Sequence, residues 1–128
     1  MEKIIHTYKD LIVWQKAMDL VVNVYILTEK FPREELYGLI SQMRRSAVSI
    51  PSNITEGRLR GHRKEYRQFL RNAHGSGGEL ETQIEISKRL PKMKDLDFQR
   101  VDNLLEEVMK MLNKIISNLK LILNKLKS

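Results

Sequence analysis

The sequence predicts an all-α fold, an antiparallel up-down four-helix bundle in which residues 1–128 form one domain. Three observations lead to this class. The chain has only three prolines and six glycines. Its apolar residues recur at spacings of three and four, the period of an amphipathic helix, and no run alternates with the period of a strand. A chain of 128 residues can bury one hydrophobic core but not two.

Four segments carry the helical pattern, separated by short turns. We expect helices over about residues 11–29, 34–58, 62–90 and 97–126. Asp10 is the candidate N-cap of the first helix, and Pro32 marks the turn that follows it. The fourth helix repeats apolar residues from Phe98 to Leu126 in steps of three and four without a slip. It is therefore predicted to pack along its whole length.

The second helix contains a proline at position 51. Its apolar positions keep one register from Leu36 to Ile54, on both sides of Pro51, which predicts a kinked but continuous helix. The rival interpretation starts a new helix at Pro51 and makes Ile50 its N-cap, a residue type disfavoured there. Either of two glycines can end this helix. They are Gly57 and Gly61.

The third helix includes the glycine-rich stretch "HGSGGELE" at residues 74–81. A phosphate-binding loop would follow a strand and end in Gly-Lys-Ser/Thr, and this stretch does neither. Small residues in helical phase instead predict the close approach of another helix. Glu79 and Glu81 are then expected to form structural ion pairs rather than to act as catalytic acids.

Two of the helices are more apolar than a monomeric bundle requires. The first helix is apolar on most of its surface, and the fourth carries further apolar residues outside its main stripe. Because exposed apolar surface favours association, we expect a homo-oligomer that uses the first helix, the fourth, or both. The alternative is a monomer with scattered apolar residues on its surface.

The net charge is +7, with a pI of about 9.7, and the excess is concentrated in one part of the chain. Residues 1–43 hold five basic and six acidic side chains, whereas residues 44–74 hold eight and two. Residues 75–128 hold ten and eight. Such a basic segment is compatible with a polyanionic ligand.

The basic residues of the third helix fall on one outward-facing arc, separate from its core stripe. Together with those of the second helix they form a basic ridge, the candidate nucleic-acid-binding site. Its members are Arg44, Arg45, Arg58, Arg60, Arg63, Lys64, Arg67 and Arg71. Arginine favours phosphate or carboxylate partners. The alternative is a solvated face that forms ion pairs with acidic residues of the fourth helix, such as Asp102, Glu106 and Glu107, of the same or another subunit.

Several classes of function have no support in the residues. The chain has no cysteine, so it has neither disulfides nor thiolate metal sites. No Gly-x-Ser-x-Gly motif or Glu-x-x-His pair occurs, and we therefore expect no enzymatic activity, no metal and no cofactor. The N-terminal stretch lacks the apolar run of a signal peptide, and no apolar stretch approaches 18 residues. We expect a cytoplasmic protein that does not span a membrane.

Three stretches carry a resemblance to a known family. They are "DLIVWQKAMDL", "FPREELYGLISQMRRSAVSIPSNITEG" and "EYRQFLRNAHGSGGELETQIEISKRL". Over roughly residues 10–90 the chain resembles the bacterial four-helix-bundle proteins encoded in intervening sequences of 23S ribosomal RNA genes. The resemblance implies a five-fold ring and kinship with the accessory variability protein of diversity-generating retroelements, a basic barrel that looks built to bind nucleic acid and a reverse transcriptase. It implies no enzymatic activity.

Two functions follow as expectations. The first is an oligomer, with a pentamer implied by the resemblance, that binds nucleic acid through phosphate contacts, with RNA favoured. Such binding would be largely independent of base sequence, because most aromatic residues lie on apolar stripes rather than among the arginines. The second is an oligomeric scaffold whose basic ridge docks an acidic protein partner.

Overall fold

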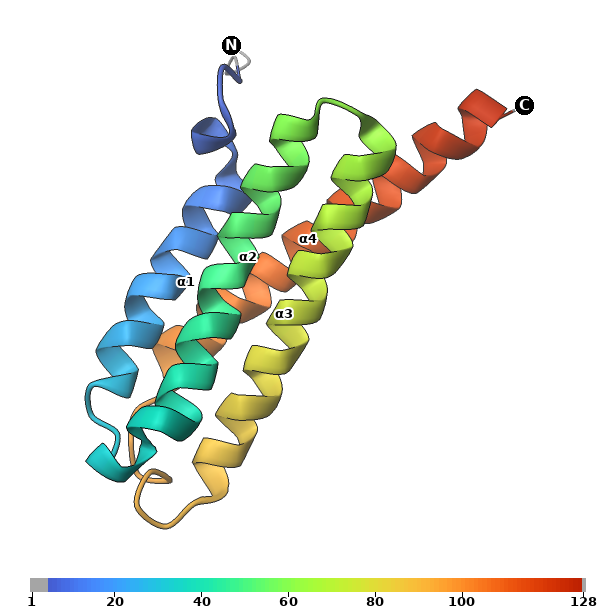
Figure 1. Ribbon diagram of the computed structural model, residues 1–128. Coiled ribbons are helices and arrows are strands. Elements are labelled where there is room, and N and C mark those ends of the chain that lie inside the picture. The colour runs from blue at the N-terminus through green and yellow to red at the C-terminus, as the bar shows by residue number, and fades with distance from the viewer. Residues whose placement is uncertain (1–4, 128) are drawn as a thin grey trace.

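The computed structural model describes residues 5–127, and these residues form helices with no strand among them (Figure 1). The four long helices are α1 (Ile12–Thr28), α2 (Ser41–Arg60), α3 (Arg63–Arg89) and α4 (Gln99–Lys127). Shorter helical segments are η1 (Tyr8–Asp10), η2 (Arg33–Glu35) and η3 (Leu36–Ile40). The chain reverses direction between successive long helices, so sequence neighbours run antiparallel (Figure 1). The all-α four-helix class is confirmed.

Asp10 caps a different element from the one predicted. Its carboxylate accepts hydrogen bonds from the backbone N–H groups of His6 and Thr7, at 2.9 and 3.1 Å, and so closes a capping box around η1. The N-cap of α1 is Leu11, which forms no side-chain capping bond. The prediction for Asp10 is wrong because a short helical turn precedes α1 and takes up the carboxylate.

The second predicted helix begins later than expected. The backbone at Gly38, inside η3, is not helical, with φ −110° and ψ −114°, and this irregular stretch precedes the regular helix α2. From Ser41 onward α2 continues through Pro51 without interruption, as predicted. Gly61, with φ 78°, forms the left-handed C-cap. Continuity across the proline is therefore confirmed, whereas the bend at Pro51 stays a prediction.

The core contains the apolar stripes predicted for the four helices. Its fully buried side chains include Leu20, Met43, Ile50, Ile54, Leu70, Leu80, Ile84 and Leu112. The stripe of α4 is buried or half-buried as far as Leu119, but Ile122 and Leu126 are 39% and 67% exposed. The prediction that α4 packs along its whole length is wrong for this end. The reason is visible in Figure 1, where the last turns of α4 project away from the other helices.

Two glycines set how closely the helices approach. A Cβ at Gly57 of α2 would lie 2.7 Å from the Cβ of Phe69 on α3. A Cβ at Gly77 of α3 would lie 2.3 Å from the sulfur of Met109 on α4. The predicted role in helix approach is confirmed for Gly77, whereas Gly75 and Gly78 face open space within the described structure.

The long helices are amphipathic rather than apolar throughout. Within residues 5–127, no helix combines the length and the apolar character needed to cross a membrane.

Candidate nucleic-acid interface

The first half of α3, residues 63–74, contains four of the eight residues of the predicted basic ridge and presents three of them fully to solvent. Arg63, Lys64 and Arg71 are exposed, and none has an ion-pair, hydrogen-bond or aromatic partner among residues 5–127. Like charges spaced three or four residues apart destabilise a helix slightly. A polyanion placed against this surface would remove that repulsion.

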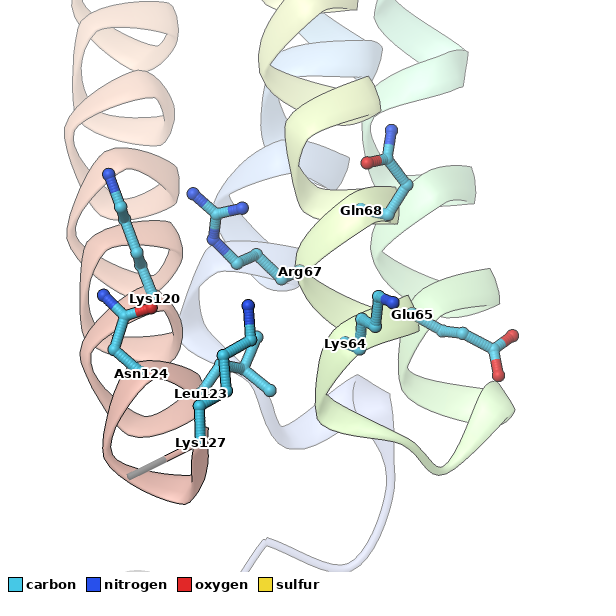
Figure 2. A pocket seen from close by; sticks show the side chains of 8 residues that line it. All are labelled: Lys64, Glu65, Arg67, Gln68, Lys120, Leu123, Asn124 and Lys127. Carbon is cyan, nitrogen blue, oxygen red and sulfur yellow. The ribbon is translucent and has the colours of Figure 1, made fainter.

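Arg67 lies deeper than its neighbours and connects α3 to α4. Its Nε donates a hydrogen bond to the backbone carbonyl of Ile116, at 3.3 Å. The side chain is half-buried, and Figure 2 shows it reaching from α3 toward α4. Since Nε is engaged, the outer guanidinium nitrogens are the groups that can meet a ligand.

A groove lies between the first half of α3 and the last turns of α4 (Figure 2). We call it the basic groove, and it has a volume of about 700 Å³. Its lining consists of Lys64, Glu65, Arg67, Gln68, Lys120, Leu123, Asn124 and Lys127. The carboxylate of Glu65 points away from α4 in Figure 2, so it does not lie between the cations of the two helices. Cations therefore stand on both walls of the groove.

The cations on the α4 wall, Lys120 and Lys127, were missed by sequence reasoning. A signal for them exists, since residues 108–128 hold five lysines and no acidic residue. The near-neutral charge of residues 75–128 taken together conceals this basic stretch. Every acidic side chain of that segment precedes position 108, so the lysines after it are not balanced locally. Only the placement of α4 beside α3 shows that these lysines share a surface with Arg67.

Arg58 and Arg60 lie at the connection between α2 and α3, and both contact aromatic rings. The guanidinium of Arg58 lies 5.6 Å from the ring centroid of Tyr66, and that of Arg60 lies 5.3 Å from the ring centroid of Phe69. Arg60 also forms an ion pair with Glu56, at 2.8 Å. Arg60 is therefore partly neutralised, although an exposed pair of this kind contributes little stability.

Burial raises the pKa of the Tyr66 phenol, and the charge and hydrogen bond of Arg58 act in the opposite direction. The phenol is therefore neutral at physiological pH, and Arg58 keeps its positive charge uncompensated by this contact.

Arg44 and Arg45 lie at the opposite end of α2, away from the basic groove. Arg44 donates from Nε to the hydroxyl of Thr28, at 2.9 Å, and its guanidinium lies 4.5 Å from the ring centroid of Tyr25. It therefore joins α1 to α2. Arg45 is exposed beside Tyr37 in a separate hollow. The structure does not bring these two predicted residues together with those of α3.

The alternative that the ridge pairs with acidic residues of α4 is wrong for contacts within the chain. Asp102 binds Lys88 at 2.7 Å, Glu106 binds Lys110 at 3.0 Å, and Glu107 binds Lys16 at 3.3 Å, so all three acids have other partners. Within the described residues the cations of residues 63–74 thus keep their charge. Across that same part of the chain, no group of three or more metal-ligating side chains is placed to hold a metal ion.

Comparison with known families gives an assignment over most of the chain. The model described as "23S rRNA-intervening sequence protein" matches residues 9–114. The match takes in α1, α2, α3 and the first half of α4, whereas Lys120 and Lys127 lie beyond it. A comparison with curated proteins gives no significant match. The chain belongs to the 23S rRNA-intervening sequence protein family.

Proposed function

We propose that this protein is a cytoplasmic, non-enzymatic oligomer that binds nucleic acid, with RNA favoured, through phosphate contacts in the basic groove. The observation that carries the proposal is the set of cations on the two walls of that groove, none of which has an ion-pair partner among residues 5–127. Family membership is compatible with nucleic-acid association.

The lining of the groove indicates which part of a nucleic acid it meets. Lys64, Arg67, Lys120 and Lys127 supply positive charge, and no aromatic side chain occurs among the eight lining residues. Stacking with bases requires aromatic or guanidinium planes, whereas phosphate contacts require only positioned cations. The proposed binding is therefore governed by the sugar-phosphate backbone and depends weakly on base sequence.

Charge reversal tests the proposal directly. The variant Arg63→Glu/Arg67→Glu/Arg71→Glu removes three ridge cations and places repelling charges there. We expect its affinity for a fluorescein-labelled RNA, measured by anisotropy at moderate salt, to fall by about 100-fold or more. Light scattering and circular dichroism establish that the variant keeps its assembly and its helices.

The matched control is Arg33→Glu/Lys94→Glu/Arg100→Glu. It changes the net charge by the same amount at three exposed residues away from the groove. We expect a loss of no more than a few-fold. An equal loss in both variants would mean that only net charge matters, and unchanged binding in the ridge variant would reject the proposal.

The rival function, docking of an acidic protein partner, has a separate test. The tagged protein is recovered from lysate with and without nuclease treatment. Under our proposal the copurifying nucleic acid disappears after the treatment, together with any protein that it carried. A stoichiometric protein partner that survives nuclease and is lost in the ridge variant would support the scaffold function instead.

The oligomeric part of the proposal is supported by apolar side chains that the bundle leaves uncovered on α1 and α4. They include Ile12, Val22, Ile26, Leu121 and Leu126, all at least half exposed. Burying such exposed apolar side chains against another copy would remove them from water and so favour association. Light scattering at micromolar concentration should give the mass of a homo-oligomer, with a pentamer as the specific expectation. A monomer mass at that concentration would contradict it.

A further inference from the structure

The turn that joins α2 to α3 (Figure 1) contains a small hollow. We call it the turn hollow, and it has a volume of about 280 Å³. The described residues that line it are Gly57, Arg58, Gly61, His62, Arg63 and Tyr66, and none of them is acidic. Two guanidinium groups and an imidazole therefore share one small space that no lining carboxylate neutralises.

The turn brings Arg58 and Arg63 to the same hollow although they belong to different helices. Gly61, with φ 78°, adopts the left-handed conformation that favours glycine, and the chain reverses there. The guanidinium of Arg58 forms a hydrogen bond with the phenol of Tyr66 and lies 5.6 Å from the centroid of its ring. Because Tyr66 is buried, this contact holds Arg58 in place before any ligand binds.

The other polar groups of the turn hollow are uncommitted within residues 5–127. Arg63 is exposed and has no partner in that part of the chain. His62 is the N-cap of α3, but its side chain forms no capping hydrogen bond. Glu56, the acidic residue of α2, pairs with Arg60 at 2.8 Å. The hollow therefore offers guanidinium and imidazole N–H groups to an anion.

A phosphate at the end of a nucleic-acid strand differs in charge from a phosphate within it. A terminal phosphomonoester carries a charge of about −1.5 to −2 at pH 7 and has three acceptor oxygens. An internal phosphodiester carries a single negative charge. The two guanidinium charges of Arg58 and Arg63 match the monoester, and guanidinium groups bind phosphate oxygens through paired hydrogen bonds. The charge of the turn hollow thus favours a terminal phosphate over an internal one.

We propose that the turn hollow binds the terminal phosphomonoester of a nucleic-acid strand whose adjoining nucleotides lie in the basic groove. This inference rests on the proposed function and names the end of the strand as the part that is recognised. The two sites adjoin, because Arg63 lines the turn hollow and Lys64, the next residue, lines the basic groove. The hollow also has less than half the volume of the groove, which suits a single group rather than a length of strand.

RNAs that differ only at their ends test the proposal. Three copies of one single-stranded sequence, labelled at an internal position, carry a 5′-phosphate, a 3′-phosphate or hydroxyl groups at both ends. We expect a phosphate at one end to raise the affinity about tenfold over the hydroxyl-ended RNA, measured by anisotropy at moderate salt. The RNA that shows the gain identifies the end. Equal binding of the three RNAs would overturn the inference, whereas the proposed function fails separately, when the hydroxyl-ended RNA does not bind.

Substitutions in the turn hollow should abolish this preference. In Arg58→Gln/Arg63→Gln the phosphate-ended and hydroxyl-ended RNAs should bind equally. The matched control, Arg33→Gln/Arg100→Gln, removes the same charge at exposed residues that do not line the hollow, and it should keep the preference. Lys120→Glu/Lys127→Glu should weaken all three RNAs and also keep the preference, because neither lysine lines the hollow. A preference that survives Arg58→Gln/Arg63→Gln would mean that the added charge acts only at long range, and it would overturn the inference.

A probe without a strand tests the turn hollow by itself. Ribose 5-phosphate is titrated into the isotopically labelled protein and followed by NMR, with ribose as the matched probe that lacks the phosphate. We expect the backbone amide resonances of Gly61, His62 and Arg63 to shift with ribose 5-phosphate alone, and not to shift in Arg58→Gln/Arg63→Gln. Equal shifts with ribose, or none at the turn, would overturn the inference whatever the outcome of RNA binding.

Discussion

The two halves of α3 differ in how their charges are satisfied. In residues 63–74, Arg63, Lys64 and Arg71 have no partner within the described structure. In residues 75–89, Lys88 binds Asp102 at 2.7 Å and Glu85 at 3.5 Å. One helix therefore carries three unpaired cations at its beginning, whereas near its end Lys88 is neutralised and Arg89 is the one cation of that half with no ion-pair partner among residues 5–127.

Acidic residues increase the difference in charge between the two halves of α3. Glu79 and Glu81 in the second half are exposed without an ion-pair partner among residues 5–127, so the expectation that they form structural pairs is wrong. The outer surface of α3 is thus positive at one end and negative further along. A polyanion is attracted to the first half and repelled by the second, which confines it to the end that borders the basic groove.

After the charge reversal of the ridge, the next largest effect is expected from the α4 wall of the groove. Lys120→Glu/Lys127→Glu should lower RNA affinity by about tenfold or more and make the log-log salt slope shallower by about two, since two phosphate contacts are lost. Anisotropy titrations at several salt concentrations measure both quantities.

The matched control for that variant is Lys110→Glu/Lys114→Glu. It has the same charge change on the same helix, but neither residue lines the groove. Equal losses in both variants would show that α4 contributes only general charge.

A smaller effect, on stability, is expected at the connection that positions the first half of α3. Gly57→Val places side-chain atoms where Phe69 and the backbone of Tyr66 already lie, at 2.7 and 3.3 Å from the Cβ position. Overpacking of this kind costs about 1–3 kcal/mol of unfolding free energy, measured by urea denaturation.

Gly75→Ala is the control for this substitution, because a Cβ at that position meets open space within the chain. It should stabilise the helix by about 0.5–1 kcal/mol. Equal stability of the two variants would contradict the role assigned to Gly57.

The smallest effect is expected at the paired end of α3. The hydrogen bond and charge of Asp102 raise the pKa of Lys88 above its ordinary value, despite partial burial. The folded state therefore favours the charged ammonium. This contribution to stability is fully present below the ordinary lysine pKa of 10.5 and is lost as pH rises through the higher folded value.

Lys88→Met should accordingly reduce the unfolding free energy by less than about 1 kcal/mol near pH 8, since the pair is about one-third exposed. The difference from the unmodified protein should vanish above the folded pKa of Lys88. Lys64→Met, which removes an unpaired cation, should leave stability unchanged. A difference for Lys88→Met that persists at the highest pH would mean that the side chain acts through packing alone.

The fold was predictable from the sequence because burial follows helical periodicity closely. Met43, Ile50 and Ile54 keep one register across Pro51, and all are fully buried. The start of α2 was not predictable, since the non-helical backbone at Gly38 leaves no trace in the spacing of apolar residues. The exposed end of α4 has the same spacing of apolar residues as its buried part. The two parts differ in burial only because the other helices end before the last turns of α4.

The candidate site was predictable only in part. Position on a helical face identified the exposed cations of α3. The sequence pattern alone cannot show that Arg44 is engaged by neighbouring side chains whereas Arg63 is free of partners among residues 5–127. Arg44 is engaged because Thr28 and Tyr25 of α1 happen to lie beside it, which is a property of tertiary packing. The lysines of the α4 wall join the site for the same kind of reason, through the proximity of two helices far apart in sequence.

The most direct measurement of the central claim is the salt dependence of RNA binding by the unmodified protein. If the four cations of the groove and the adjoining Arg63 and Arg71 together neutralise about five phosphates, the logarithm of the binding constant falls with the logarithm of salt concentration at a slope of about −4 to −5 for duplex and less for a single strand. A slope near zero, or binding too weak to measure at low salt, would contradict the claim that these cations receive a nucleic acid.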